Sequence, residues 1–128
     1  MTTRIATSPD TVVRVLRVSA VLTVGSVAFQ FVTAGQLFPD GGPEQVHAGG
    51  AIALHVLSGL TALTAVLLWR RYGAAARLAV LAVVVFGLTF VQAATGGRST
   101  LWIHVPGAMV VTVGAAWVMV GSLGRLRD

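Results

Sequence analysis

Cysteine and lysine are absent from this 128-residue chain, and charged residues of any kind are scarce. Without cysteine there are no disulfides, no thiolate metal sites, no cysteine nucleophile and no haem attached covalently through a Cys-x-x-Cys-His motif. Any metal bound by this chain must therefore be held by histidine, carboxylate or thioether ligands. Only 10% of the residues are charged and 55% are hydrophobic, which is more apolar surface than a soluble domain of this size buries.

Four apolar segments dominate the chain, each about as long as the 20 or so residues that a helix needs to cross a hydrocarbon core of about 30 Å. A β-barrel would instead read as alternating strands of about ten residues, and none are visible. We therefore predict an all-α integral membrane four-helix bundle that forms one transmembrane domain over residues 1–128. The first segment is too long for a typical signal-peptide core and is interpreted as a retained span. The predicted spans are residues 18–38, 46–69, 74–94 and 101–123.

All nine basic residues are arginines, and eight of them flank the same side of the predicted bundle. Cytoplasmic segments of membrane proteins are enriched in arginine and lysine, so we predict a bacterial plasma membrane protein with both termini inside. The net charge of +5 and the pI of about 11.7 are interpreted as topology determinants and contacts for the lipid bilayer, not as a nucleic-acid surface. The eight are Arg4, Arg14, Arg17, Arg70, Arg71, Arg77, Arg125 and Arg127, and Arg98 falls in an outer loop.

A faint internal duplication relates the first two spans to the last two. Residues 25–30, Gly-Ser-Val-Ala-Phe-Gln, resemble residues 87–92, Gly-Leu-Thr-Phe-Val-Gln. The second and fourth spans open with His47-Ala-Gly-Gly and His104-Val-Pro-Gly. Each half thus carries a glutamine on its first helix and a His-x-x-Gly on its second. This pattern predicts two tandem helix hairpins related by a pseudo-two-fold axis along the membrane normal.

The polar residues within the spans fall into two layers when their distance from the inner arginines is counted. Gln30, His55 and Gln92 are predicted about 20–23 Å above the inner boundary. His47 and His104 are predicted at about 32–35 Å, near the outer face. Polar and metal-capable side chains in hydrocarbon are costly and usually mark function, so these residues are the candidates for a functional site.

His47 and His104 form a candidate haem site. If the second and fourth helices lie across the bundle from each other, as the duplication implies, the two imidazoles face one another at equal depth. Two such imidazoles are the axial ligands that the iron of a b-type haem requires, with the macrocycle packed among apolar side chains. The alternative is that both are hydrated interfacial histidines at helix starts that bind nothing.

These features resemble a known protein family. A four-span bundle with a histidine at the outer start of each even-numbered span resembles one half of haem A synthase. It is more similar to a family of small four-span bacterial membrane proteins, in which a Gln-x-x-x-Ala-Gly segment ends the first span and a histidine opens the second, here Gln30 to Gly35 and His47. Glu44-Gln-Val-His47 is also similar to the Glu-x-x-His of haem A synthase. The chain is half as long as that enzyme and has no arginine after His47 and no outer cysteine pair, so the resemblance implies a haem b-binding relative and not haem A synthesis.

His55 is predicted to have a structural role, because it lies about 12 Å deeper than His47 and about 80° around the same helix. An imidazole at that depth would exchange hydrogen bonds with Gln30 or Gln92, which satisfies polar groups in hydrocarbon. Two further roles are open at this point. His55 could pair with His104 across a tilted haem, or it could contact a proton or a quinone.

Three functions are compatible with this pattern. The first is a small membrane haem protein that transfers electrons to a redox partner or quinone, or handles haem, near the extracytoplasmic face. The second is a non-catalytic membrane subunit or scaffold that packs against partner proteins or a second copy of itself, with structural histidines. The third, a transporter, is less well supported because no charged residue lies within the spans and four helices offer little alternating-access machinery.

Overall fold

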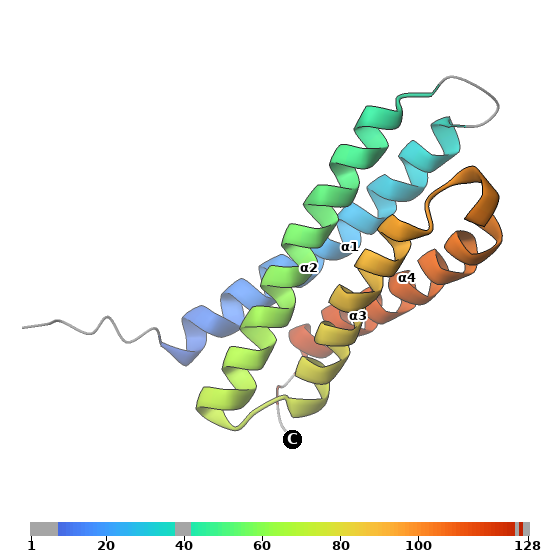
Figure 1. Cartoon of the computed structure of the whole chain (residues 1–128). Helices are drawn as coiled ribbons and strands as arrows, with labels where there is room; N and C mark the ends of the chain where they lie inside the picture. The colour runs from blue at the N-terminus through green and yellow to red at the C-terminus, as the bar shows by residue number, and fades with distance from the viewer. Residues whose placement is uncertain (1–7, 38–41, 125, 127–128) are drawn as a thin grey trace, which may run out of the picture.

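The computed structural model describes residues 8–37, 42–124 and 126, and over these residues the chain forms four long helices that run alternately up and down (Figure 1). All four are long and apolar enough to cross a membrane, so the predicted all-α membrane four-helix bundle is confirmed. The elements are α1 (Pro9–Gln36), α2 (Glu44–Tyr72), α3 (Ala76–Ala94), the 3-10 turn η1 (Arg98–Thr100) and α4 (Leu101–Leu123).

The first helix begins well before the predicted first span. Ser8 accepts a hydrogen bond from the backbone N–H of Thr11 at 3.3 Å, and Pro9 occupies the first turn, which is a common way to begin a helix. The predicted span included only the apolar part of this helix. Arg14 and Arg17 therefore lie on α1 itself. The predicted end of the span, Phe38, lies outside the described residues.

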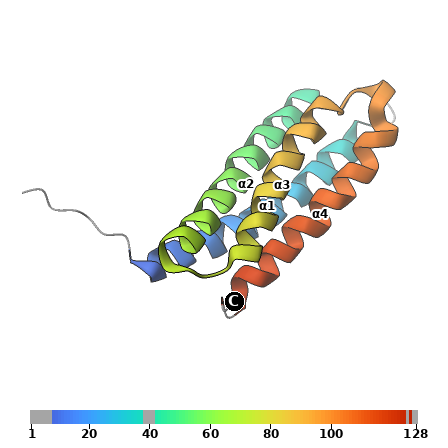
Figure 2. The ribbon, with the colours of Figure 1, turned by 60° about the horizontal axis from the view of Figure 1, so that its bottom comes forward.

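The helices form a ring in which α1 and α3 each pack against both α2 and α4 (Figures 1 and 2). Within the described part of the chain, the diagonal pairs α1–α3 and α2–α4 make no helix–helix contact. The hairpins α1–α2 and α3–α4 therefore lie side by side, with α2 against α3 and α1 against α4. The second and fourth helices lie diagonally across the bundle.

The duplication extends to the buried core, because buried positions of the second hairpin coincide with buried positions of the first at a constant register. In α4 and α2 the matched pairs are Val111 with Leu54, Ala115 with Ser58, Val118 with Thr61, and Ser122 with Ala65. In α3 and α1 they are Ala82 with Ala20, Val85 with Thr23, and Thr89 with Val27. The weak sequence repeat therefore corresponds to a real structural repeat.

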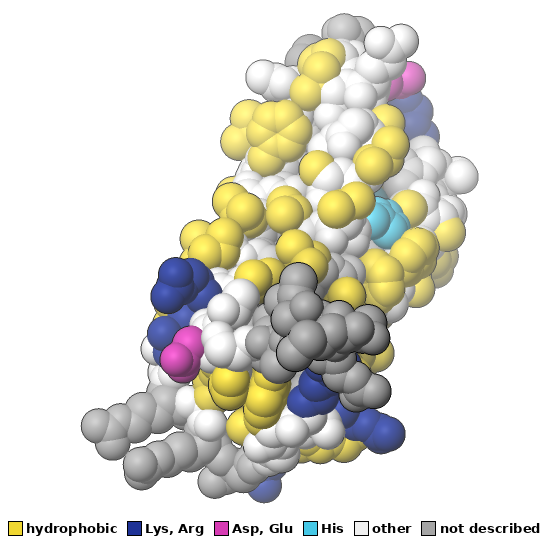
Figure 3. Space-filling view, turned by 90° about the vertical axis from the view of Figure 1, so that its left-hand side faces the viewer, with side chains coloured by type: hydrophobic (Ala, Val, Ile, Leu, Met, Phe, Trp, Pro, Cys, Tyr) yellow, Lys and Arg dark blue, Asp and Glu magenta, His cyan; other side chains and the backbone are white. Residues whose placement is uncertain are grey.

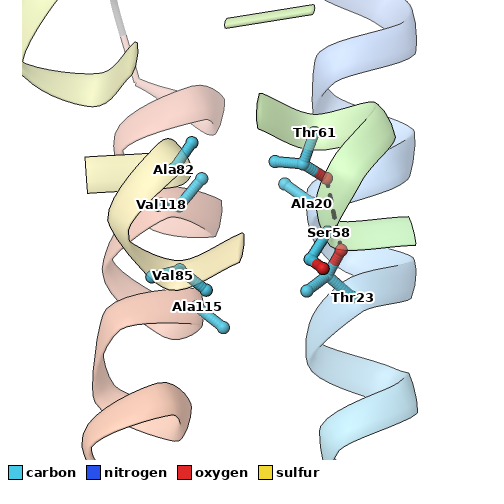
Figure 4. A pocket seen from close by; sticks show the side chains of 8 residues that line it. All are labelled: Ala20, Thr23, Ser58, Thr61, Ala82, Val85, Ala115 and Val118. Atoms are coloured by element: carbon cyan, nitrogen blue, oxygen red, sulfur yellow. Dashed lines mark hydrogen bonds between the residues drawn. The ribbon is translucent and has the colours of Figure 1, made fainter. Parts of the chain in front are cut away.

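A small cavity of about 10 Å³ lies at the centre of the ring, lined by two side chains from each helix (Figure 4). The first hairpin contributes hydroxyl groups, and the Oγ1 atoms of Thr23 and Thr61 lie 3.2 Å apart. The second hairpin contributes only alanine and valine. A volume of this size is at the lower limit for holding one water molecule. The two halves of the core thus share a shape but differ in polarity.

Arg17 connects α1 to the C-terminal end of α4. Its Nε donates to the carbonyl of Ser122 at 2.9 Å, and its Nη2 lies 3.5 Å from the carbonyl of Gly124. Carbonyls at a helix C-terminus lack intrahelical partners and attract cations. One arginine of the predicted inner set therefore serves the fold by capping α4 from α1.

We expect Gly114→Ala to lower the free energy of unfolding by about 1–3 kcal/mol through overpacking. A Cβ at Gly114 would lie 2.6 Å from Cγ2 of Val85, and valine in a helix has one strongly preferred rotamer. Gly87→Ala on α3 is the matched control, because nothing lies within 4 Å of its Cβ position. It should be neutral or stabilising by up to about 1 kcal/mol. Reversible unfolding in detergent measures both, and equal stabilities would contradict the packing described here.

Candidate functional site

His47 and His104 occupy equivalent places in the two hairpins. Each is on the first turn of the second helix of its hairpin, and each bonds through Nδ1 to the last turns of the first helix. The Nδ1 of His47 lies 2.9 Å from Oγ1 of Thr33, and the Nδ1 of His104 lies 3.0 Å from the backbone carbonyl of Gln92. The two imidazoles are therefore held through the same ring nitrogen, His47 by a hydroxyl group and His104 by a backbone carbonyl.

The contact with Gln92 determines which ring nitrogen of His104 carries the proton. A carbonyl only accepts, so the Nδ1 of His104 must be the N–H donor. The hydroxyl of Thr33 has a single hydrogen and lies 3.1 Å from the carbonyls of Phe29 and Gln30 and 2.9 Å from Nδ1 of His47. When that hydrogen is donated to a carbonyl, the hydroxyl accepts from Nδ1–H of His47. A neutral imidazole protonated at Nδ1 has its free lone pair on Nε2, so His104 presents an unprotonated Nε2, and His47 does so in that arrangement.

The two imidazoles are partly buried and lie at the same end of the ring, on helices that are diagonal to each other. Thr33, which holds His47, is only 2% exposed. The partner of His47 on α1 is therefore a buried group.

The glycine of each His-x-x-Gly motif packs against the glutamine of the facing helix. A Cβ at Gly50 would lie 2.8 Å from Oε1 of Gln30, and a Cβ at Gly107 would overlap the side-chain amide nitrogen of Gln92. In each hairpin the glycine thus makes room for the glutamine of the facing helix. This contact explains why glutamine and His-x-x-Gly recur together in the two halves of the sequence.

The two glutamines differ in how their side chains are satisfied. The Oε1 of Gln30 lies 3.3 Å from Oγ1 of Thr33, whose single hydrogen it shares with the carbonyls of Phe29 and Gln30. The Oε1 of Gln92 is buried and has no hydrogen-bond partner among the described residues. Leaving a buried acceptor unpaired costs about 1–3 kcal/mol. An unpaired buried acceptor in a folded protein requires an explanation. One explanation is that the Oε1 of Gln92 contacts a bound ligand.

His55 has a different partner from the one predicted. Its Nδ1 lies 2.7 Å from the carbonyl of Ala51 on its own helix, and its ring packs edge-on against Phe90 with centroids 4.5 Å apart. The expected hydrogen bond to Gln30 or Gln92 is not among its contacts in the described structure. A local carbonyl satisfies the imidazole at no cost in helix–helix geometry, and the ring of His55 packs between α2 and α3.

Thr33 is the site residue that sequence reasoning missed. It lies within the Gln-x-x-x-Ala-Gly segment, immediately before Ala34, and its counterpart by register in α3 is Thr95. Thr95 donates to its own helix at Val91 O, 2.8 Å away, and contacts no imidazole. A threonine at both positions was visible in the sequence, but which of them meets a histidine depends on the rotation of the helices.

Neither a larger metal-binding cluster among the described residues nor a match to a known protein adds to these observations. Residues 8–37, 42–124 and 126 contain no group of three or more histidine, cysteine or carboxylate side chains that could hold a metal ion. No family model, no curated protein and no solved structure matches the chain. The two histidines and their surroundings are therefore the observations that bear on function.

We expect Gln92→Leu to leave the free energy of unfolding unchanged or to raise it by about 1 kcal/mol, because it removes a buried acceptor that has no partner. Gln30→Leu, the matched variant in the other hairpin, removes the acceptor near Thr33 and should be neutral or destabilising. Unfolding in detergent compares the two. A large loss of stability in Gln92→Leu would mean that its carboxamide is bonded to something beyond the described residues.

Proposed function

We propose that this chain is a small membrane protein that binds haem b between His47 and His104, for electron transfer or haem handling. The observation that carries the proposal is the matched pair of imidazoles, each held through Nδ1 and each without a hydrogen bond at Nε2 from the described residues. Axial histidines in haem proteins use this arrangement, since an acceptor for the second ring nitrogen orients the ligand and raises its basicity. Two hydrated interfacial histidines would have no need of buried partners.

The residues present fit the donor set of a b-type haem. Two neutral imidazoles are sufficient axial ligands because the macrocycle supplies the other four nitrogens. Arg98 in η1 is the one cation at this end of the described bundle, and it offers a partner for carboxylate groups. Bound haem would supply one-electron chemistry. The chain's own contribution is to fix the two tautomers, hold the imidazoles in place and provide apolar surroundings.

The positive-inside rule supports an orientation for the proposed site. Arg14, Arg17, Arg70, Arg71 and Arg77 lie at the end of the bundle opposite His47 and His104, and we infer that this end is cytoplasmic. The histidines then lie near the extracytoplasmic face of a bacterial plasma membrane. A redox partner outside the cell, or quinone in the outer leaflet, would be within reach.

We expect the wild-type protein, purified in detergent after expression with adequate haem, to have the optical spectrum of low-spin bis-histidine haem. The sharp Soret band and the reduced α and β bands should be lost in His47→Ala and in His104→Ala, because each removes one axial ligand. His55→Ala is the matched control, since His55 is also held through Nδ1 by an acceptor but is assigned to packing. It should keep the spectrum of bound haem.

The same experiment separates the competing functions. A visible spectrum that stays featureless after haemin is added would overturn the proposal and favour a non-catalytic membrane subunit. Loss of the spectrum in His55→Ala and His104→Ala, with His47→Ala unaffected, would place the haem between His55 and His104. Helix content by circular dichroism checks that each variant is folded.

We expect Thr33→Val to weaken haem retention by about 10- to 100-fold, the usual effect of removing the hydrogen-bond partner of a ligating histidine. The substitution keeps the shape of the side chain but removes the hydroxyl group that bonds to Nδ1 of His47. Thr95→Val is the matched control at the equivalent position and should retain haem as the wild type does. Titration of apoprotein with haemin measures both, and equal affinities would contradict the role given to Thr33.

A further inference from the structure

A groove of about 250 Å³ runs along the outside of the bundle between α1 and α2, at the end opposite the histidines. Its walls include Val18 and Leu22 of α1 and Leu57 and Leu60 of α2. Ser19, which is buried, lies at its base and donates its hydroxyl hydrogen to the carbonyl of Leu16 at 3.1 Å. Between these helices the groove therefore offers an incoming molecule an apolar surface.

Arg14 lines the same groove at its arginine-rich end. Its side chain is exposed and makes no hydrogen bond or ion pair with any described residue, unlike that of Arg17, which caps α4. Asp10, one turn earlier on α1, is the one carboxylate at this end of the described chain. Most of the arginine surface visible in Figure 3 also gathers toward this end, below a hydrophobic surface.

We propose that this groove binds one acyl chain of an anionic phospholipid, with the phosphate of its headgroup on Arg14. Along α1 the groove extends from Arg14 to Leu22, about 12 Å. Because Arg14 lies at its arginine-rich end, a phosphate bound there belongs to a lipid of the arginine-side leaflet. Basic groups at the membrane boundary that adjoin a cleft between transmembrane helices are a recognised way to select anionic headgroups.

The second hairpin carries different residues at the equivalent positions. By register, Arg14 corresponds to Ala76, Ser19 to Leu81 and Leu60 to Trp117. The exposed cation is replaced by a methyl group and the small base of the groove by a larger side chain. The proposed lipid site is thus a property of α1 and α2, one per chain, and not a consequence of being apolar at this depth.

Native mass spectrometry of the detergent-purified protein tests this proposal, with phosphatidylglycerol or phosphatidylcholine of identical acyl chains added in increasing amounts. We expect the wild type to retain one phosphatidylglycerol in preference to phosphatidylcholine. Arg14→Gln should weaken phosphatidylglycerol retention about fivefold, the factor that corresponds to one arginine–headgroup interaction. Arg77→Gln removes the same charge from α3 at the same end and should leave retention unchanged.

A second pair of variants tests the groove itself. Val18→Trp should fill it and reduce retention of both lipids, whereas Val80→Trp should not. Val18 and Val80 are register counterparts of nearly equal exposure, 55% and 57%, so both variants should fold, as circular dichroism will check. Equal effects of Arg14→Gln and Arg77→Gln would overturn the proposal, because retention would then depend on basic charge spread over this end of the bundle. Unchanged retention in Val18→Trp would show that the groove is not occupied.

Discussion

Every polar hydrogen in this bundle needs an acceptor, because the surrounding hydrocarbon supplies none. The buried hydroxyls meet this need locally, as Ser58 and Thr61 do by donating to carbonyls one turn back at 2.7 and 2.8 Å. The three histidines obey the same constraint through Nδ1. Its consequence is chemical as well as structural, since an imidazole satisfied at Nδ1 presents Nε2 as a base or ligand.

The two hairpins share one fold but differ in the polarity of their side chains. The paired glutamine and glycine contacts hold both hairpins in the same way, and buried positions match between them. Polarity has diverged on this common frame. Thr23 and Thr61 line the central cavity from the first hairpin, where Val85 and Val118 stand in the second. The lipid groove and the orphan oxygen of Gln92 are further places where the halves differ.

Much of the fold was predictable because it depends on local properties. Apolar length gives the spans, arginine distribution gives their predicted orientation, and the recurring His-x-x-Gly gives the hairpin repeat. The pairing of His47 and His104 as equivalent residues also followed from the repeat. The partner of His55 was predicted wrongly, because a nearby carbonyl, that of Ala51, competes with any distant glutamine and requires no long-range geometry.

The sequence by itself determined the class of protein, the number of long helices and the candidate metal ligands. Only the tertiary structure decided that Thr33 meets a histidine, that Arg17 caps α4, and that Arg14 lies beside a groove without a partner among the described residues. The physical reason is that helices in a membrane are apolar on nearly all sides, so that amphipathicity does not mark which face is turned inward. Helix rotation is set by close packing between small residues and by polar pairing, which appear only when the helices are assembled.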